Sequence, residues 1–385
     1  MHLAFALGFR DCSLPASRWL GRLARHVLLL GWLVTCAVEP PAAFGQVGSV
    51  DNTFSPGLGF ATNVTVQTMV LQPDGKLIVG GTFPGYASVT SSNIIRINSD
   101  GTADAAFITG LGFRNTNSAL AAQVRGLALQ PDGRILVAGL FNTFGVSGLA
   151  NFVRLNVNGT VDATYINNHR SSVDGVVLLQ NGDALHADVR SSGPGGSILQ
   201  GVAGRLASGA TNAAFDSSLD FGSSLTGGGF PIPPSIRTLV EQADGKILVA
   251  GRFTDAGGTP RTHLLRLDPT GTLDVGFDPG AITTTGGSGD QVYGILLQSD
   301  QKLIIFGRFD DVAGTACRNI ARLNSDGTLD QAFDPGTGAV GNFNGGEILS
   351  AVLQSDGKII IGGRFTTYNG TTANRLARLN ADGSL

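Results

Sequence analysis

The chain has 385 residues, of which 42% are hydrophobic and only 14% charged, and it contains 56 glycines. A hydrophobic share of this size excludes an intrinsically disordered chain, and the many glycines predict frequent turns. The formal net charge is −3, and lysine and arginine do not cluster on any predicted element. We therefore expect no nucleic-acid partner.

The first 45 residues differ from the rest of the chain. An apolar run at 27–38 follows several arginines, and the small residues Ala43 and Gly45 come after two prolines. This order of basic region, apolar region and small residues is typical of a secretory signal peptide. The run is too short to span a bilayer, which takes about 20 apolar residues. We therefore predict a signal peptide at 1–45, cleavage before Gln46, and a secreted, periplasmic or cell-surface chain without a membrane span.

Two alternatives stay open for this segment. One is a segment that is retained, either as a buried helix or as an anchor. The other is lipid attachment at Cys36, because the preceding Leu33-Val34-Thr35 resembles a lipoprotein box, although threonine is a poor match before the cysteine. Cys12 lies in the same segment, so cleavage leaves only Cys317 and no intramolecular disulfide. The mature domain at 46–385 must then be stabilised by packing.

Two phrases return along the mature domain. The first reads LQPDGKLIVGG from Leu71, and copies start at 129, 241, 297 and 353, with a weaker copy at 179. The second reads RLNSDGTLDQAF from Arg322, and a counterpart follows each copy of the first. A period of about 56 residues indicates one supersecondary unit that is repeated. The six predicted repeats are 64–107, 122–165, 171–215, 235–277, 291–333 and 348–385.

Each repeat divides into four short segments rich in β-branched and aromatic residues. In the fifth repeat they are 293–298, 302–309, 319–324 and 328–333, with turn residues such as Asp326-Gly327 between them. Glycine accepts the positive φ that such a tight turn needs. No sustained apolar period of 3.6 residues occurs in the mature chain, so helices should be few. The pattern predicts an all-β fold, a six-bladed β-propeller of four-stranded antiparallel blades.

The two ends of the repeat region complement each other. The sixth repeat stops at Leu385 without a fourth segment, whereas residues 48–54 resemble such a segment, with Asp51 at the position of Asp330. The N-terminal strand at 48–54 can therefore complete the last blade and remove an open sheet edge. The alternative is a chain that continues beyond Leu385 into further blades or a sorting domain.

An arginine opens the second phrase, and an acid follows eight residues later in most copies. Because these positions face each other across a hairpin, we expect cross-strand ion pairs, each worth a few tenths of a kcal/mol to about 1, rather than a ring of ligand-binding arginines. In the third repeat Asn212 replaces the acid. The structural repeat positions are the arginines Arg96, Arg154, Arg266, Arg322 and Arg378, the acids Asp51, Asp104, Asp162, Asp274 and Asp330, and the turn glycines Gly101, Gly159, Gly271, Gly327 and Gly383.

Aromatic residues recur at two further positions in the repeats. Burial of each aromatic side chain between blades can contribute a few kcal/mol to the stability of the fold. We expect core packing there rather than a stacking surface for sugar. The first set is Phe83, Phe141, Phe253, Phe309 and Phe365, and the second is Phe54, Phe107, Tyr165, Phe215, Phe277 and Phe333.

The two phrases together, LQPDGKLIVGG and RLNSDGTLDQAF, resemble the delta-60 repeat, a bacterial β-propeller repeat family. The resemblance covers about residues 48–385. It implies the propeller fold but no catalytic residue, cofactor or defined biochemical role. The third copy departs from the pattern, since Asp188 and Val189 replace the usual glycine and arginine-phenylalanine region. We therefore expect a less regular third blade.

Metal-binding and nucleophilic patterns are weak in this chain. The turn phrase of the fifth repeat offers oxygen donors at Asn324, Asp326 and Asp330, but Arg322 stands where a calcium loop needs an acid. The histidines are not spaced as a metal pair, and Cys317 has no histidine close to it in sequence. We predict no catalytic residue, no metal site and no cofactor.

The loops after each second strand, such as 310–318, vary in length and can build a binding face. We therefore favour an exported, monomeric and non-catalytic protein that acts as a binding or scaffold module for an extracellular protein or polysaccharide. The alternative is a carbohydrate-active hydrolase or lyase with carboxylates around the propeller channel. The candidate carboxylates are Asp188, Asp255, Asp310 and Asp311.

Overall fold

The computed structural model describes residues 53–385 apart from 63, 108, 117–120, 145–146, 149–150, 166–172, 174, 192–197, 217–218, 223, 226–230, 233, 285–288 and 342–345. Asn52–Leu385 forms one compact unit, and its described residues form strands and turns without a helix. Accordingly, no described helix could cross a membrane. The predicted signal peptide at 1–45 and residues 48–52 of the predicted closing strand lie outside the described residues.

Each repeat folds into one antiparallel sheet, in which the first strand pairs with the second and the second with the third. The second strands are rich in isoleucine, leucine and valine and are mostly buried, because a neighbouring sheet covers each face. The all-β prediction is therefore confirmed. The sheets are β1 (Thr65–Leu71), β2 (Leu77–Thr82) and β3 (Ile94–Ile97); β5 (Gln123–Leu129), β6 (Ile135–Leu140) and β9 (Phe152–Leu155); β10 (Val176–Leu178), β11 (Ala184–Ser191), β12 (Ile198–Arg205) and β13 (Thr211–Asp216); β16 (Ser235–Glu241), β17 (Ile247–Arg252) and β20 (Leu264–Leu267); β22 (Gln291–Leu297), β23 (Leu303–Arg308) and β26 (Ile320–Leu323); and β28 (Ile348–Leu353), β29 (Ile359–Gly363) and β32 (Leu376–Leu379).

The predicted fourth strand is shorter than expected. In four repeats it is a single bridge, as between Leu323 and Leu329, so these sheets have three strands. The acid that follows turns the chain out of the ladder: Asp330 Oδ1 accepts a hydrogen bond from the backbone N–H of Ala332 (3.0 Å), and the Asp330 carbonyl accepts one from Phe333 (3.2 Å). Among the described residues, only the third repeat has a full fourth strand, β13.

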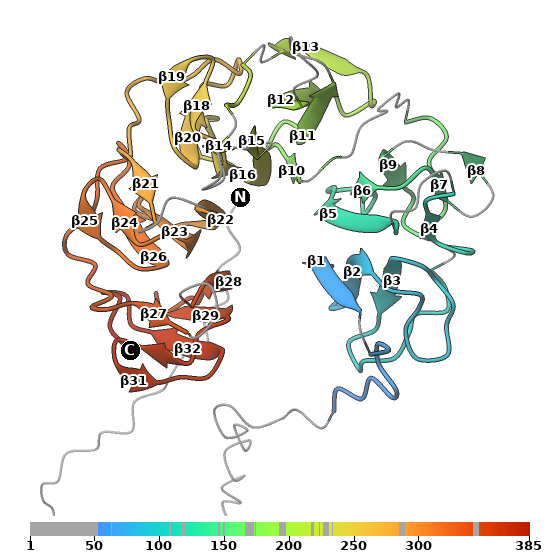
Figure 1. Ribbon diagram of the computed structural model, residues 1–385. Helices are drawn as coiled ribbons and strands as arrows, with labels where there is room; N and C mark the ends of the chain where they lie inside the picture. The colour runs from blue at the N-terminus through green and yellow to red at the C-terminus, as the bar shows by residue number, and fades with distance from the viewer. Residues whose placement is uncertain are drawn as a thin grey trace, which may run out of the picture. The chain divides into compact units, whose positions relative to one another are not determined.

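The six sheets follow one another around a common centre, and the first strand of each lies innermost (Figure 1). Successive inner strands contact each other in the order β1, β5, β10, β16, β22 and β28. Neighbouring sheets share apolar clusters, as where Leu248 and Leu264 of the fourth repeat pack with Leu303 and Leu323 of the fifth. The core therefore lies between the sheets.

The recurring aromatic side chains pack into this core, as predicted. The first set is no more than 3% exposed, and the second set is no more than 7% exposed apart from Phe54. Phe54, at the start of the described chain, is 37% exposed. The burial of these rings leaves them no room to act as a stacking surface for a ligand.

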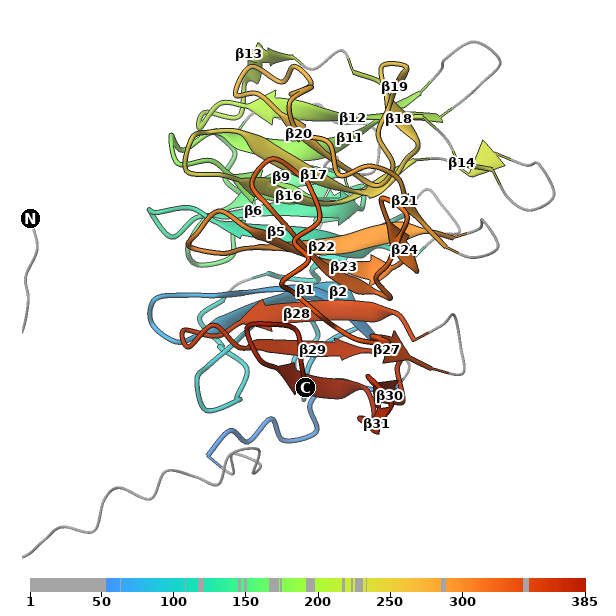
Figure 2. The ribbon, with the colours of Figure 1, turned by 90° about the vertical axis from the view of Figure 1, so that its left-hand side faces the viewer.

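In four repeats the segment after the second strand forms a small hairpin rather than a variable loop. In the fifth repeat, β24 (Asp311–Val312) pairs with β25 (Thr315–Ala316) and with β21 (Ile282–Thr283), which precedes the repeat. These hairpins gather on one side of the array (Figure 2). The region 310–318 is thus a regular hairpin of the repeated frame rather than a variable loop, and a binding role for it stays a prediction. The equivalents are β4 (Phe113–Arg114), β7 (Thr143–Phe144) and β8 (Ser147–Gly148); β18 (Asp255–Ala256) and β19 (Thr259–Pro260); and β27 (Ala339–Val340), β30 (Thr367–Tyr368) and β31 (Thr371–Thr372).

The turn glycine of the second phrase has a positive φ in every repeat, between 87° and 97°. Close packing adds a second requirement. A Cβ placed on Gly327 would lie 2.9 Å from the backbone nitrogen of Asp278, in the connection from the preceding repeat. A side chain at this turn would therefore strain the backbone and push the two repeats apart.

Candidate functional site

The innermost strand of five repeats contains a β-bulge. In β22, Val292 pairs with Gly307 and Gly294 with Phe306, so Tyr293 between them has no partner in the ladder. A bulge of this kind re-aims a side chain and is common beside binding sites. The bulged residues of the five repeats are Gln67, Arg125, Arg237, Tyr293 and Leu349.

The glycine opposite each bulge explains why the strand can deform there. A Cβ on Gly307 would lie 2.3 Å from the carbonyl oxygen of Gln291, and one on Gly251 would lie 2.0 Å from that of Ser235. These distances are far shorter than any real contact of a Cβ atom. Only glycine, which has no Cβ, therefore lets the inner strand pack this close to the second strand. The last glycine of the first phrase therefore marks the bulge.

All five bulged side chains line a single cavity of about 670 Å³. The inner strands that carry them surround the centre of the array (Figure 1). Gln123, Ser235 and Glu347, each two residues before a bulge, also line it. So do Arg308, at the end of β23, and Arg364, directly after β29. The cavity has the size of a small-ligand site.

The lining is cationic. Four arginines face a single carboxylate, Glu347, among the described lining residues. Glu347 is buried, and its Oε1 lies 3.0 Å from Arg364 Nη1 while its Oε2 accepts a hydrogen bond from the Tyr293 hydroxyl at 2.6 Å. Burial, followed by the hydrogen bond to Glu347, raises the pKa of Tyr293, so this hydroxyl stays a donor at neutral pH.

Two of the arginines are not ion-paired within the described residues. Arg237 donates from Nε to the side-chain oxygen of Gln291 at 3.3 Å. Arg308 lies against the backbone, since a Cβ on Gly289 would come within 2.7 Å of its Nη1. The positive charges of Arg237 and Arg308 both act to lower the pKa of Tyr293, although burial and Glu347 outweigh them. The two guanidinium groups therefore act on the same hydroxyl. This part of the cavity offers several donors and an excess of positive charge.

Of the carboxylates proposed from the sequence, Asp255, Asp310 and Asp311 are not among the described lining residues of this cavity. Asp255 and Asp311 accept hydrogen bonds from the backbone N–H groups of Gly258 (3.1 Å) and Gly314 (2.8 Å), within the small hairpins. Asp310 Oδ1 lies 3.4 Å from Arg318 Nε. Asp188 lies in β11, opposite Gly201.

The repeated arginine and acid meet in four repeats. The Nε to Oδ2 distance is 2.7 or 2.8 Å for the pairs Arg96 with Asp104, Arg154 with Asp162, Arg266 with Asp274 and Arg322 with Asp330. Each arginine also lies over the aromatic ring that ends its phrase, 4.5 to 5.1 Å from the ring centre. Arg378 of the last repeat is exposed, and Asp51 lies outside the described residues.

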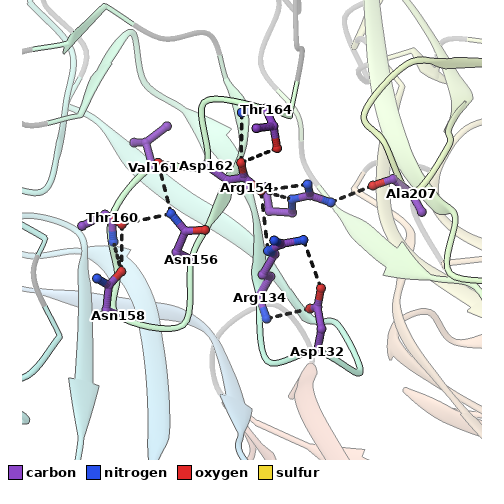
Figure 3. Close-up of polar contacts among 10 residues, drawn as sticks. All are labelled: Asp132, Arg134, Arg154, Asn156, Asn158, Thr160, Val161, Asp162, Thr164 and Ala207. Atoms are coloured by element: carbon purple, nitrogen blue, oxygen red, sulfur yellow. Dashed lines mark hydrogen bonds and ion pairs between the residues drawn. The ribbon is translucent and has the colours of Figure 1, made fainter.

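Two further contacts were not evident from the sequence. In the second repeat, Arg134 from the first phrase lies 3.6 Å from Asp162, so the carboxylate faces two cations (Figure 3). Arg154 Nη1 donates to the carbonyl oxygen of Ala207 in the next repeat at 2.6 Å. Each such cluster therefore joins two sheets as well as two strands. Arg154 is buried in the frame, whereas Arg134 lines a pocket of about 390 Å³ together with Asp132 and Asn156.

The turn phrase considered for calcium has other contacts. Asp326 Oδ1 accepts hydrogen bonds from the backbone and hydroxyl of Thr328, and Asp330 faces Arg322 and Lys302. No group of three or more His, Cys, Asp or Glu side chains is arranged as a metal site in the part of the chain that is described. Cys317 is buried, and burial raises its pKa to about 11, so the thiol is unreactive at neutral pH.

The bulged residues were missed because successive ones are more than 50 residues apart and do not form a motif along the chain. A signal was nonetheless present. Within the repeated strand before the first phrase, one position changes from Gln67 to Arg125, Arg237, Tyr293 and Leu349 while its neighbours stay apolar or small. A variable position on a repeated frame is where a repeat protein carries its specificity.

Five segments match the DUF5122 β-propeller family. The family is described as "Domain of unknown function (DUF5122) beta-propeller", and the matched residues are 72–107, 130–165, 242–277, 298–333 and 354–385. The DUF5122 segments omit 171–215, the copy that departs from the pattern and carries the full fourth strand. Together with the antiparallel sheets around one centre, the match shows a β-propeller fold.

Solved structures show looser similarity. Virginiamycin B lyase from Staphylococcus aureus is 14% identical with a TM-score of 0.45, covering 84% of this chain and 86% of the lyase. PorZ, a surface component of the type-IX secretion system of Porphyromonas gingivalis, is 17% identical with a TM-score of 0.42, covering 83% of this chain and 39% of PorZ. YCF48, solved bound to a D1 peptide, is 11% identical with a TM-score of 0.40, covering 84% of this chain and 83% of that one. No curated protein matches the chain.

Proposed function

We propose that this protein is an exported, non-catalytic β-propeller that binds an extracellular polysaccharide or protein in its central cavity and acts as a monomer. The observation that carries this proposal is the set of five bulged side chains, which comprise four residue types although the frame that holds them is the same. Varied polar groups on rigid strands are what specific binding requires.

The charge of the cavity favours binding over hydrolysis. A carbohydrate-active hydrolase needs two carboxyl groups about 5 to 10 Å apart. Among the described lining residues the cavity has one, Glu347, and its two oxygens are engaged by Arg364 and Tyr293. A carboxylate held in this way is suited to positioning the two side chains around it.

We also propose that residues 1–45 are a signal peptide cleaved before Gln46 and that the repeats are delta-60 repeats. The basic, apolar and small-residue regions of the leader support export. The two phrases support the repeat family. Mass determination of the mature N-terminus tests cleavage, and a mass increase on a chain that starts at Cys36 would show lipid attachment instead.

We propose that the six sheets are six blades of a closed ring, with residues 48–54 as the outer strand of the last blade. Unpartnered apolar faces at the two ends of the array support closure. On the first sheet, Met69 is 62% exposed where its equivalent Ile295 is 7% exposed; on the last, Leu376 is 66% exposed where Ile320 is buried. Each end therefore presents a face that the inner sheets cover with a neighbour.

The path of the chain after Phe54 also supports closure. The backbone N–H of Ser55 donates to the carbonyl of Asp100 at 2.7 Å. Asp334, the residue after Phe333, makes the same contact with Asp382 in its next repeat at 2.8 Å. The chain thus enters the first repeat as it enters the sixth from the end of the fifth, which is the path expected if 48–54 ends a preceding blade.

A ligand screen tests the proposed function. The protein, expressed from its full coding sequence, is screened by thermal shift against cell-surface polysaccharides and secreted proteins. A ligand at 100 times its Kd should stabilise the fold by about 2.7 kcal/mol. The substitution Tyr293→Ala should abolish the shift, and Thr315→Ala in an outer hairpin should preserve it. A ligand whose shift survives Tyr293→Ala, or one that is cleaved by the protein, would contradict binding without catalysis at the cavity.

A further inference from the structure

We propose that the central cavity binds an acidic oligosaccharide by placing a sugar carboxylate between Arg237 and Arg308. This inference rests on the proposed function and names the chemistry of its ligand. Arg237 is exposed and Arg308 half-buried, so both can be reached by a ligand. They line the same cavity, and neither is ion-paired within the described residues.

The charge balance of the cavity favours an anion. Glu347 is the single described carboxylate of the lining and already contacts Arg364. The positive charges of Arg237 and Arg308 therefore remain for an incoming group. A guanidinium group binds a carboxylate through two parallel hydrogen bonds, and a recess lined by one sign of charge concentrates the opposite sign.

The rest of the lining favours a sugar over a peptide. Among the described lining side chains, only Leu349 lacks a polar group. The oxygen of Gln123 accepts from Arg125 and Gln67, which leaves the Gln67 oxygen to accept from a hydroxyl group and the Gln123 nitrogen to donate to one. A peptide would bind by adding a strand to the inner edge of a sheet. The bulges at Arg125, Arg237 and Tyr293 interrupt that edge on three of the inner strands and oppose strand addition.

The test compares a charged ligand with its neutral form. Binding of trigalacturonate, its fully methyl-esterified form and a pentaglutamate peptide is measured by calorimetry at two salt concentrations. Trigalacturonate should bind about 10-fold or more tightly than the ester, more weakly at higher salt, and more tightly than the peptide. Equal binding of acid and ester, preference for the peptide, or no binding of the acid would overturn the inference.

Variants locate the contact. Arg237→Gln and Arg308→Gln should each weaken trigalacturonate binding by about 10-fold or more, with an unchanged melting temperature. Arg318→Gln, which alters an arginine paired with Asp310 in an outer hairpin, should bind as the parent does. Loss of binding in Arg318→Gln, or its persistence in both cavity variants, would place the carboxylate elsewhere. If trigalacturonate does not bind but the thermal-shift screen finds a neutral ligand of the cavity, the acidic sugar is rejected and the proposed binding function stands.

Discussion

Arg322 reaches across a sheet boundary to Ala381, where its Nη1 donates to the backbone carbonyl at 2.7 Å. Its Nε lies 2.7 Å from Asp330 within its own repeat, and Lys302 Nζ lies at the same distance from the same carboxylate oxygen. One acid thus holds an arginine that ties two repeats together. Because the same contact recurs at other boundaries, the sheets are joined by charge as well as by apolar packing.

Replacing the acid at this boundary should destabilise the fold. Asp330→Asn leaves a mostly buried guanidinium without its countercharge, so the free energy of unfolding should fall by about 2 to 4 kcal/mol. Urea denaturation measures the change. Asp300→Asn is the control, because Asp300 is exposed and asparagine can still accept the hydrogen bond from the Lys302 backbone. Equal midpoints for the two variants would mean that the cluster contributes nothing.

The same acid should keep its contribution far into the acid range. Burial alone would raise the pKa of Asp330, but hydrogen bonds from Lys302, Ala332 and Arg322 outweigh it and hold the value at about 2. The folded pKa lies below the unfolded one, so the stabilisation is complete above pH 4 and is lost as pH falls towards 2. The stability difference between the protein and Asp330→Asn, measured by urea titration, should therefore be constant from pH 7 to 5. A difference that shrinks in that range would contradict this.

His263 should make stability depend on pH in a higher window. Burial lowers its pKa to about 4, so the neutral ring is favoured in the folded state, where its Nδ1 accepts a hydrogen bond from the Phe253 N–H at 3.3 Å. Protons bind the unfolded chain preferentially between about pH 6.5 and 4. The protein should therefore lose roughly 2 to 3 kcal/mol of stability between pH 7 and 4.5 from this residue.

An internal comparison suggests the variant that removes this effect. Asn319 occupies the equivalent position, accepts the equivalent hydrogen bond from Phe309 at 3.2 Å, and has the same positive φ, which asparagine tolerates well. His263→Asn should therefore preserve the contact and flatten the stability profile between pH 7 and 4.5, measured by urea midpoints. An unchanged profile would mean that another group titrates.

The repeat arithmetic predicted much of this fold. Sheets, turn glycines and the facing of Arg322 and Asp330 follow from local pairing, which each copy of the two phrases specifies independently. The prediction of a full fourth strand was wrong because the Asp330 side chain accepts a hydrogen bond from the backbone N–H of Ala332 and turns the chain out of the sheet. That competition between side chain and ladder is invisible in a pattern of apolar residues.

The cavity could not be predicted in the same way. Arg237 and Arg308 lie on different repeats, and only the radial arrangement brings them to one lining. The glycine that permits each bulge, such as Gly307, recurs in the sequence. Its role in the bulge depends on strand register, because only the paired strands bring the Gln291 carbonyl oxygen to 2.3 Å from the position that a Cβ would occupy.

One turn carries a strained residue that glycine should relieve. The first-phrase turn has glycine at positive φ in the other repeats, as at Gly357 (81°), whereas the fifth repeat has Gln301 at 66°. A left-handed conformation costs a non-glycine residue roughly 1 kcal/mol. Gln301→Gly should raise the free energy of unfolding by about that amount, and Gly357→Gln, whose Cβ would meet only Ala381 at 3.7 Å, should lower it. Shifts of the same sign in the two variants would exclude backbone strain as the cause.

The proposed ring closure predicts a coupling between Asp51 and Arg378. If residues 48–54 complete the last blade, Asp51 stands to Arg378 as Asp330 stands to Arg322, and Arg378→Ala should cost as much stability as Arg322→Ala. In an open array an exposed Arg378 contributes within about 0.5 kcal/mol. A double-mutant cycle with Asp51→Asn and Arg378→Ala, measured by urea denaturation, should give a coupling of about 1 to 3 kcal/mol. Strict additivity of the two changes would show that the two residues do not meet and that the ring is not closed by this strand.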